Sequence, residues 1–378
     1  MKKIGILTYY YGNYNYGGLL QAYALTEYLS GIGYDAEQIC FIKPKNNKKN
    51  VSLKTRLRWK LSAAKGGAVK LYTKIRYKNV MRSIEERNRA FLNFIGTVKH
   101  SDKVYDRNSL HKTNDIYDVF IAGSDQIWNL VWYAPEYFLS FVNEGKTKLS
   151  YAASLPQREL TPEQAEILRK HLADFKGVSV RESQAVDLLQ SIGIPSYHAA
   201  DPTLLLNRSE WDKVCPERKV KDKYVFCYFL TNSAAERNAA KEFAKKKNLK
   251  IVTLPHLTGV AWEDLDFGDI QLYDISPFDF VSLIKHAEYV ITDSFHAAVF
   301  SNIYKKQYFV FGRKGGEYMN SRINSLLFLL DAETRLCNIK DNGAEEYLLS
   351  LDDIDYSKPA PKFEELRRIS ENFLKSML

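Results

Sequence analysis

Residues 289–296 (YVITDSFH) join an apolar, strand-like run to Asp293, Ser294 and His296. Helical spacing follows over residues 297–304, so we expect a buried parallel strand that turns into a helix. In open α/β sheets, ligands bind beyond the carboxyl ends of the strands, and a helix N-terminus favours anions. His296 can exchange a proton near neutral pH and is therefore a candidate catalytic residue. The alternative is that Asp293 or Ser294 only caps the helix while His296 packs beneath it.

Arg313, Lys314 and Arg322 form a cationic group after the strand expected at residues 307–311. Glycines beside this group allow a ligand to approach the backbone closely. Guanidinium and ammonium groups bind carboxylates and phosphates, so we expect these side chains to bind an anion. The alternative is a solvated run of charges.

Residues 10–21 (YYGNYNYGGLLQ) form a loop of Asn, Tyr and Gly that leads into an expected helix. Asn15, Tyr16 and Gly17 can offer amide, hydroxyl and backbone N–H groups to a sugar or an anion. The GxGxxG pattern is not present, so dinucleotide binding is not indicated. We expect this loop to contact a sugar or an anion.

A second loop, residues 123–129 (GSDQIWN), follows an apolar strand. Ser124, Asp125 and Gln126 can form hydrogen bonds with sugar hydroxyls. The indole of Trp128 can cover the apolar face of the same sugar ring. The alternative is that Ser124 or Asp125 caps a helix and that Trp128 fills the core.

Arg181 and Asp201 follow two further strands, expected at residues 177–180 and 197–200. The fork of an arginine can bind a carboxylate or a phosphate through two hydrogen bonds. The side chain of Asp201 is a candidate base at the same edge of the sheet. The alternatives are a structural ion pair between Arg181 and Glu182, and a simple turn at Asp201.

Short apolar runs alternate with helical patterns along the chain, which predicts an α/β fold built from βαβ units. A charged stretch (KVCPERKVKDK) at residues 213–223 interrupts the pattern. We therefore expect two Rossmann-like domains, residues 1–210 and 211–378, that face a cleft, the architecture called GT-B. The last helix would cross back over the first domain. The expected strands are residues 4–9, 118–122, 149–153, 177–180, 197–200, 224–230, 250–254, 288–292 and 307–311, and the expected helices are residues 17–30, 163–175, 234–247, 278–286, 297–304, 319–330 and 362–378.

Bulk properties of the chain exclude several classes of protein. Apolar runs stay well short of the about 18 residues that a transmembrane helix needs. The apolar residues near the N-terminus are typical of a core strand and lack the cleavage site of a signal peptide, so we expect a cytoplasmic protein. The four cysteines are far apart, with no CxxC pair and no histidine at metal-ligand spacing. We expect reduced thiols and no bound metal.

A basic segment, residues 43–82, holds fourteen Lys or Arg and no Asp or Glu. Because the net charge of the whole chain is +9, the remainder carries −5. Apolar and aromatic residues are interleaved with the cations, so we expect this segment to lie on an anionic membrane surface, at the inner face of the cytoplasmic membrane. A nucleic-acid partner is not expected, since no known reading motif accompanies the charge. The alternative is a solvated insertion, about residues 43–89, packed loosely on the first domain.

Segments from most of the chain, roughly residues 3–330, resemble the polysaccharide pyruvyltransferase family. The matching segments are NYGGLLQAYAL, VFIAGSDQIWN, SVRESQAVDLLQSIGI, HAADPTLLL and YVITDSFHAAVFSNIYKKQ. The resemblance implies a GT-B-like fold and the transfer of pyruvate from phosphoenolpyruvate, a co-substrate, to two hydroxyls of a sugar, which gives a cyclic ketal. It implies no other cofactor. Arg181 would then hold the donor anion, and His296 would be the catalytic or phosphate-contacting histidine.

The acceptor that this resemblance implies is a precursor of a bacterial capsule or exopolysaccharide, such as a sugar linked to polyprenyl diphosphate. One motif departs from the family, because its Arg-Leu-His is here Ser294-Phe295-His296. We expect Ser294 to line the donor site. Either Arg313 or Arg322 then supplies the guanidinium that is missing at position 294, or the donor differs.

Ketal formation needs an acid that assists the departure of phosphate and a base that takes the hydroxyl proton. His296 is the candidate acid, and Asp125 and Asp201 are the candidate bases. Two other functions fit the same fold. One is a nucleotide-sugar glycosyltransferase of the GT-B type, and the other is a non-catalytic glycan-binding protein.

Overall fold

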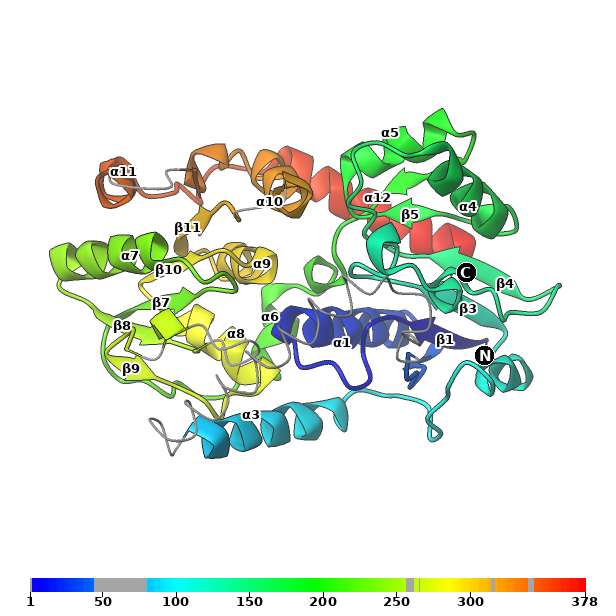
Figure 1. The fold of residues 1–378 in the computed structure, drawn as a ribbon, viewed down its shortest axis with the longest axis horizontal. Coiled ribbons are helices and arrows are strands. Elements are labelled where there is room, and N and C mark those ends of the chain that lie inside the picture. Colours follow the sequence, from blue (N-terminus) through cyan, green and yellow to red (C-terminus); the bar gives the residue numbers. More distant parts are fainter. Residues whose placement is uncertain (1, 44–79, 256–261, 265, 314–316, 339–342) are drawn as a thin grey trace, which may run out of the picture.

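The computed structural model describes residues 2–43, 80–255, 262–264, 266–313, 317–338 and 343–378. The chain forms two lobes, each built around a parallel sheet (Figure 1). Lys314 and most of the basic segment, residues 44–79, lie outside the described residues. Within the described ranges, no helix combines the length and the apolar character needed to cross a membrane.

The first sheet contains four parallel strands in the order β2-β1-β3-β4. These are β1 (Lys3–Leu7), β2 (Asp35–Gln38), β3 (Val119–Ala122) and β4 (Thr147–Ser150). Two short parallel strands, β5 (Ser179–Val180) and β6 (Tyr197–His198), pair with each other. Single bridges from Leu149 to Gly177 and from Ala153 to Val180 place this pair beside β4. The first lobe is therefore one extended parallel layer.

The second sheet contains six parallel strands in the order β12-β11-β10-β7-β8-β9. These are β7 (Tyr224–Tyr228), β8 (Lys250–Thr253), β9 (Ile270–Gln271), β10 (Tyr289–Thr292), β11 (Gln307–Phe311) and β12 (Leu336–Cys337). Every residue of β7 is buried. Val225 and Cys227 pack in one core cluster with α7 (Ala234–Lys247) and α11 (Ala344–Ser350). Phe226 and Tyr228 pack in another with α8 (Pro277–His286) and α9 (Phe295–Ile303). Helices on both faces explain why such strands appear in the sequence as unbroken apolar runs.

The helices are α1 (Tyr16–Gly31), α3 (Val80–Ile95), α4 (Pro162–Leu172), α5 (Ser183–Ser191), α6 (Arg208–Asp212), α7 (Ala234–Lys247), α8 (Pro277–His286), α9 (Phe295–Ile303), α10 (Glu317–Leu329), α11 (Ala344–Ser350) and α12 (Pro361–Met377). Short 3-10 helices are η2 (Leu110–Asp115), η3 (Leu130–Trp132), η4 (Pro135–Phe138), η5 (Pro202–Leu204), η6 (Trp262–Asp264) and η7 (Glu333–Arg335). All expected strands and helices are present. The strand β4 ends at Ser150, earlier than expected, because the chain turns at Ala152, whose φ is 47°. The predicted domain boundary falls within α6, between the two sheets.

The C-terminal helix α12 crosses back to the first lobe, which confirms the expected GT-B-like arrangement (Figure 1). The Ser370 hydroxyl accepts a hydrogen bond from the Ala200 amide at 2.8 Å. The ring of Phe373 packs against Tyr197, with 5.3 Å between the ring centroids. These contacts fix the end of the chain on the first sheet.

The helix α1 belongs to the first lobe but packs into the largest core cluster, which includes α8 and α9 of the second lobe. Tyr16 stacks on Phe280 of α8, with 4.9 Å between the ring centroids and 8° between the planes. Tyr23 contacts Trp211 at a centroid distance of 5.7 Å. A continuous apolar core therefore joins the lobes next to the carboxyl end of β10.

Candidate active site

The strand-to-helix corner expected at residues 289–296 is confirmed, since β10 ends at Thr292 and α9 begins at Phe295. The Asp293 carboxylate accepts hydrogen bonds from the backbone amides of Leu230 and Thr231 at 2.7 and 2.8 Å. It therefore holds the loop that follows β7. The Ser294 hydroxyl is the N-cap of α9 and accepts from the Ala297 amide at 3.5 Å. Both side chains thus have structural partners.

His296 lies on the first turn of α9, buried against the first turn of α1 at Gly17. Its Nε2 lies 3.5 Å from Asp201 Oδ2. Asp201 also accepts a hydrogen bond from Arg181 Nη1 at 2.7 Å and two from Thr203 at 3.0 and 2.7 Å. His296, Asp201 and Arg181 therefore form a continuous chain of ionisable side chains between the lobes.

Arg181 and Arg322 both approach the ring of Phe295. The Cζ atoms of the two arginines lie 5.0 and 5.9 Å from the ring centroid, a distance at which a cation is attracted by the aromatic face. Both guanidinium groups are buried. Within the described residues, Nε and Nη2 of Arg181 and Nε of Arg322 have no hydrogen-bond partner, and neither does Nε2 of His296. Buried donors without partners are rare and mark a place where a ligand can bind.

The charges of this group depend on one another. Burial lowers the pKa of Arg322 to about 10, and the positive charge of Arg181 adds to this effect. Burial raises the pKa of Asp201, but His296 and Arg181 outweigh burial and hold that pKa well below its ordinary value. Burial lowers the pKa of Arg181, and Asp201, Glu182 and Asp125 more than compensate, so the net pKa is raised. Asp201 therefore stays ionised, and it is a poor acceptor for a substrate proton.

Asp125 connects this buried group to an open cavity of about 420 Å³. Its Oδ1 lies 3.6 Å from Arg181 Nη2, and 17% of its side chain is exposed. Gln126 also lines the cavity, and with its amide oxygen facing Arg322 it accepts from both Nη atoms at 3.3 and 3.0 Å. Asn15, the N-cap of α1, lines the cavity as well. Two of the expected sugar-contacting residues, Asn15 and Gln126, are thus grouped around one opening with Asp125, a candidate base.

The expected sugar contacts of Ser124 and Trp128 are corrected by the structure. Trp128 is 0% exposed, stacks on Phe138 at a centroid distance of 5.4 Å, and donates its indole N–H to the Tyr137 carbonyl. Ser124 is also buried, and its hydroxyl donates to the Ala152 carbonyl at 2.6 Å. Both residues support the loop instead of facing the cavity. For Trp128 this is the alternative that the sequence left open, whereas Ser124 caps no described helix and ties the loop to Ala152.

Trp132, which the sequence did not single out, supplies an aromatic face at the cavity. It is 55% exposed and lines the opening together with Tyr9 and Tyr11. It lies only four residues after Trp128, in a run of Leu, Val, Trp and Tyr that follows Asn129. The signal in the sequence is this apolar run itself. No strand or helix is expected at residues 130–133, so nothing in the expected fold would bury the second Trp.

Arg313 has a different environment from Arg322. Its Nε donates to the Asp293 carbonyl at 3.0 Å and lies 3.9 Å from the Asp293 carboxylate. Arg313 therefore pairs with the corner between β10 and α9. Arg322 lies beside Phe295 and Gln126, so it is the arginine that the fold brings next to Arg181.

The family model for polysaccharide pyruvyl transferase matches residues 15–315. Among curated proteins there is no match. Solved UDP-N-acetylglucosamine 2-epimerases share the fold. The Rickettsia bellii structure has a TM-score of 0.56 and 12% identity over 99% of this chain and 95% of that chain. The Methanocaldococcus jannaschii structure has a TM-score of 0.52 and 13% identity over 98% of this chain and 99% of that chain.

The Neisseria meningitidis epimerase bound to UDP-GlcNAc has a TM-score of 0.51 and 14% identity over 99% of this chain and 100% of that chain. Identities this low establish the GT-B type of fold and nothing about the reaction. The family match covers the first loop from Asn15 onward, the whole second loop, Arg181, Asp201 and His296. The chain therefore belongs to the polysaccharide pyruvyl transferase family.

Proposed function

We propose that the protein transfers pyruvate from phosphoenolpyruvate to two hydroxyls of a sugar in a bacterial surface-polysaccharide precursor, with a cyclic ketal as the product. The observation that carries the proposal is the pair of buried arginines, Arg181 and Arg322, with free N–H groups beside His296. Phosphoenolpyruvate carries a carboxylate and a phosphate, and two guanidinium groups with unpaired N–H donors match two such anions. In this proposal Arg322 supplies the guanidinium that family members carry at the position of Ser294.

The reaction needs two proton transfers. One sugar hydroxyl adds to C2 of the donor while the methylene carbon gains a proton and becomes a methyl group. The second hydroxyl then replaces the phosphate, which leaves with the other proton as inorganic phosphate. We assign His296 as the acid, because its unpaired Nε2 lies in the same buried group as the two arginines that would hold the donor. We assign Asp125 as the base, because it is partly exposed at the cavity whereas Asp201 is saturated with donors.

The acceptor sugar would bind in the cavity of about 420 Å³, where Asn15 and Gln126 can hydrogen-bond its hydroxyls and Trp132 can cover an apolar ring face. Asp125 would then lie between the acceptor and the donor, within reach of Arg181. Placing both substrates in one orientation is itself a large part of catalysis in transfers of this kind.

The mouth of this cavity also supports a membrane-linked acceptor. Ile42, Val131 and Trp132 are exposed near it, and Lys43, at the start of the basic segment, donates to the Trp132 carbonyl at 2.8 Å. Exposed apolar side chains next to cations are typical of surfaces that enter the membrane interface. Removal of residues 45–80 should weaken co-sedimentation with vesicles that contain anionic lipid, and equal binding would contradict this part of the proposal.

Two separate calorimetric titrations, one with phosphoenolpyruvate and one with uridine diphosphate, test the identity of the donor. We expect saturable binding of phosphoenolpyruvate that phosphate weakens by competition, and no binding of the nucleotide. Tight binding of uridine diphosphate with no response to phosphoenolpyruvate would contradict the proposal and favour a glycosyltransferase.

A further inference from the structure

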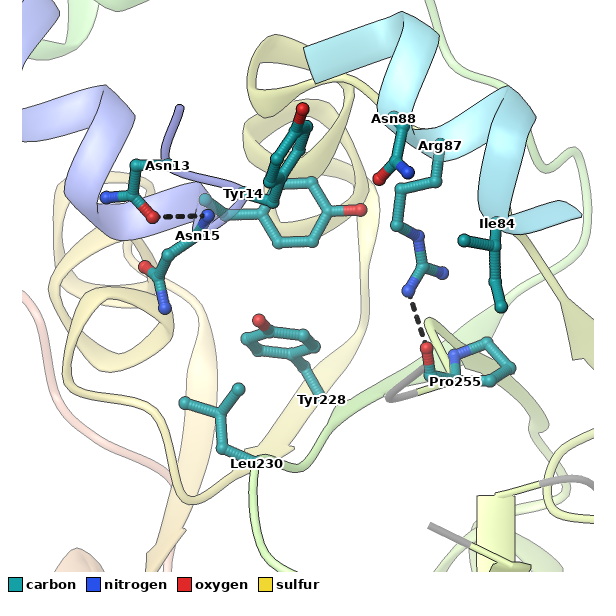
Figure 2. A pocket seen from close by; sticks show the side chains of 10 residues that line it. Asn13, Tyr14, Asn15, Ile84, Arg87, Asn88, Tyr228, Leu230 and Pro255 are labelled. Carbon is teal, nitrogen blue, oxygen red and sulfur yellow. Dashed lines mark hydrogen bonds between the residues drawn. The ribbon is translucent and has the colours of Figure 1, made fainter. Parts of the chain in front are cut away.

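A second cavity of about 450 Å³ lies between the lobes, next to the proposed acceptor site (Figure 2). The first lobe contributes the residues before and at the start of α1, and α3 contributes Ile84, Arg87 and Asn88. The second lobe contributes Tyr228, Leu230 and Pro255, from the carboxyl ends of β7 and β8. This edge of a parallel sheet is where ligands bind in open α/β folds.

Asn13 and Asn15 line both cavities, so the two spaces lie on either side of the same loop. The far wall of the second cavity is also tied to the reaction centre. Leu230 donates its amide proton to Asp293, which precedes the cap of α9, the helix that carries His296. A ligand long enough to fill both cavities would therefore pass along the loop and remain next to the site of transfer.

The lining of the second cavity fits a polyol better than a flat apolar ligand. Tyr14, 45% exposed, and Tyr228 present aromatic surface, and Ile84, Leu230 and Pro255 add aliphatic surface. Two amides stand between these walls, Asn15 at the start of α1 on one side and Asn88 of α3 on the other. An amide both donates and accepts, as sugar hydroxyls require, while aromatic faces cover the C–H face of a sugar ring.

The charge of the lining disfavours a phosphorylated ligand. Arg87 is the one charged side chain among the described lining residues. It donates to the carbonyls of Pro255, Leu272 and Tyr273 at 2.6, 3.2 and 3.2 Å, so all three of its nitrogen atoms are used to join α3 to the second lobe. Without a cation directed at the ligand, the cavity offers little to a phosphate group and favours a neutral molecule.

We propose that this second cavity binds an uncharged sugar that adjoins the sugar receiving pyruvate, so the acceptor is an oligosaccharide of at least two residues. This inference rests on the proposed function, because it takes the neighbouring cavity as the site of transfer. Asn15 contacts both sugars from its place between the cavities, and Asn88 and Tyr14 contact only the second.

The test compares two aryl glycosides as acceptors, p-nitrophenyl β-galactoside with one sugar and p-nitrophenyl β-lactoside with two. Both are assayed with phosphoenolpyruvate and the full-length protein. We expect kcat/KM for the disaccharide to exceed that for the monosaccharide by about tenfold, mainly through KM, as one well-packed sugar contributes. The change Asn88→Ala should reduce this ratio toward one, and Tyr14→Ala should do the same. Asn93→Ala, on an exposed part of the same helix, is the matched control and should keep the ratio.

Equal kcat/KM values for both glycosides, or an advantage that survives Asn88→Ala and Tyr14→Ala, would overturn the second site while leaving the pyruvyl transfer in place. If phosphoenolpyruvate is not consumed with either glycoside, saturation-transfer NMR with lactose and galactose still decides. Binding of lactose that Asn88→Ala weakens would support the second site and show that the donor assignment failed. Binding of uridine diphosphate that Asn88→Ala weakens would overturn it.

Discussion

His296 and Gly17 are in direct contact across the junction of the two lobes. A Cβ atom at position 17 would lie 1.9 Å from Nδ1 and 2.3 Å from Cγ of the imidazole ring. The absence of a side chain on the first turn of α1 is therefore what leaves room for the ring beside Asp201. The position of the proposed acid depends in this way on a glycine that lies 279 residues earlier in the chain.

Gly17→Ala should displace the His296 ring and reduce kcat by about 100-fold, the usual effect of a misplacement of about 1 Å. Gly31→Ala is the matched control, since Gly31 lies on the last turn of the same helix with no atom near an added Cβ. Steady-state rates of phosphate release from both variants check this. Full activity of Gly17→Ala would show that the ring position is not required.

Arg322→Lys keeps the positive charge but removes the buried Nε–H that we assign to the donor. The KM for phosphoenolpyruvate should rise by roughly 10-fold or more, because a compact ammonium group cannot place a donor where the guanidinium Nε lies. Arg335→Lys is the control, since Arg335 is also buried and lies over a ring, that of Phe309. It should lower the melting temperature without changing this KM. An unchanged KM in Arg322→Lys would assign the donor to other residues.

The two tryptophans of the second loop should separate binding from stability. Trp132→Ala should raise the KM for the acceptor with little effect on unfolding, because its ring is largely exposed. Trp128→Ala should cost about 3–5 kcal/mol of unfolding free energy, as the loss of a large buried ring does. Urea titration and acceptor kinetics of both variants measure this. The reverse pattern would place the sugar on Trp128.

Glu236 should make the stability of the protein depend on pH. It is buried beside Thr231, whose hydroxyl lies 3.0 Å from Glu236 Oε2 and 2.7 Å from Asp293 Oδ2. Burial, followed by the charge of Asp293, raises the pKa of Glu236 from 4.5 to about 7. Below the unfolded value the carboxyl is protonated in both states, so it carries no penalty. As pH rises toward 7, the unfolded chain ionises first, and the folded state loses stability.

Glu236→Gln should remove that penalty, so its unfolding free energy relative to the parent protein should rise by roughly 2–3 kcal/mol between about pH 5 and about pH 8. Glu242→Gln, at an exposed position of the same helix, should show no such change. Urea titrations at the two pH values measure both differences. A difference that does not vary with pH would mean that Glu236 ionises in the folded protein as it does in the unfolded chain.

Much of the fold follows from local patterns in the sequence. Apolar runs such as residues 224–230 and 289–292 could be recognised as parallel strands because both of their faces are buried. Since the polar residues after these strands gather at one edge of each sheet, Arg181 and Asp201 could be named as candidates in the first lobe and His296 in the second.

Contacts between the lobes could not be predicted in this way. The packing of Gly17 on His296 and the hydrogen bonds of Arg87 to the second lobe depend on how two sheets are oriented, which no local periodicity encodes. Which of Trp128 and Trp132 lines the cavity depends on which side of a turn faces the core. Helices such as α3, α5 and α11 were not expected at all.

The most direct test of the proposed reaction is phosphorus NMR of the purified protein with phosphoenolpyruvate and an aryl or lipid-linked galactoside. We expect inorganic phosphate to form only when the acceptor is present, together with a product whose mass has increased by one pyruvyl ketal, and His296→Ala to abolish both. Consumption of a sugar nucleotide in its place, with phosphoenolpyruvate intact, would contradict the account.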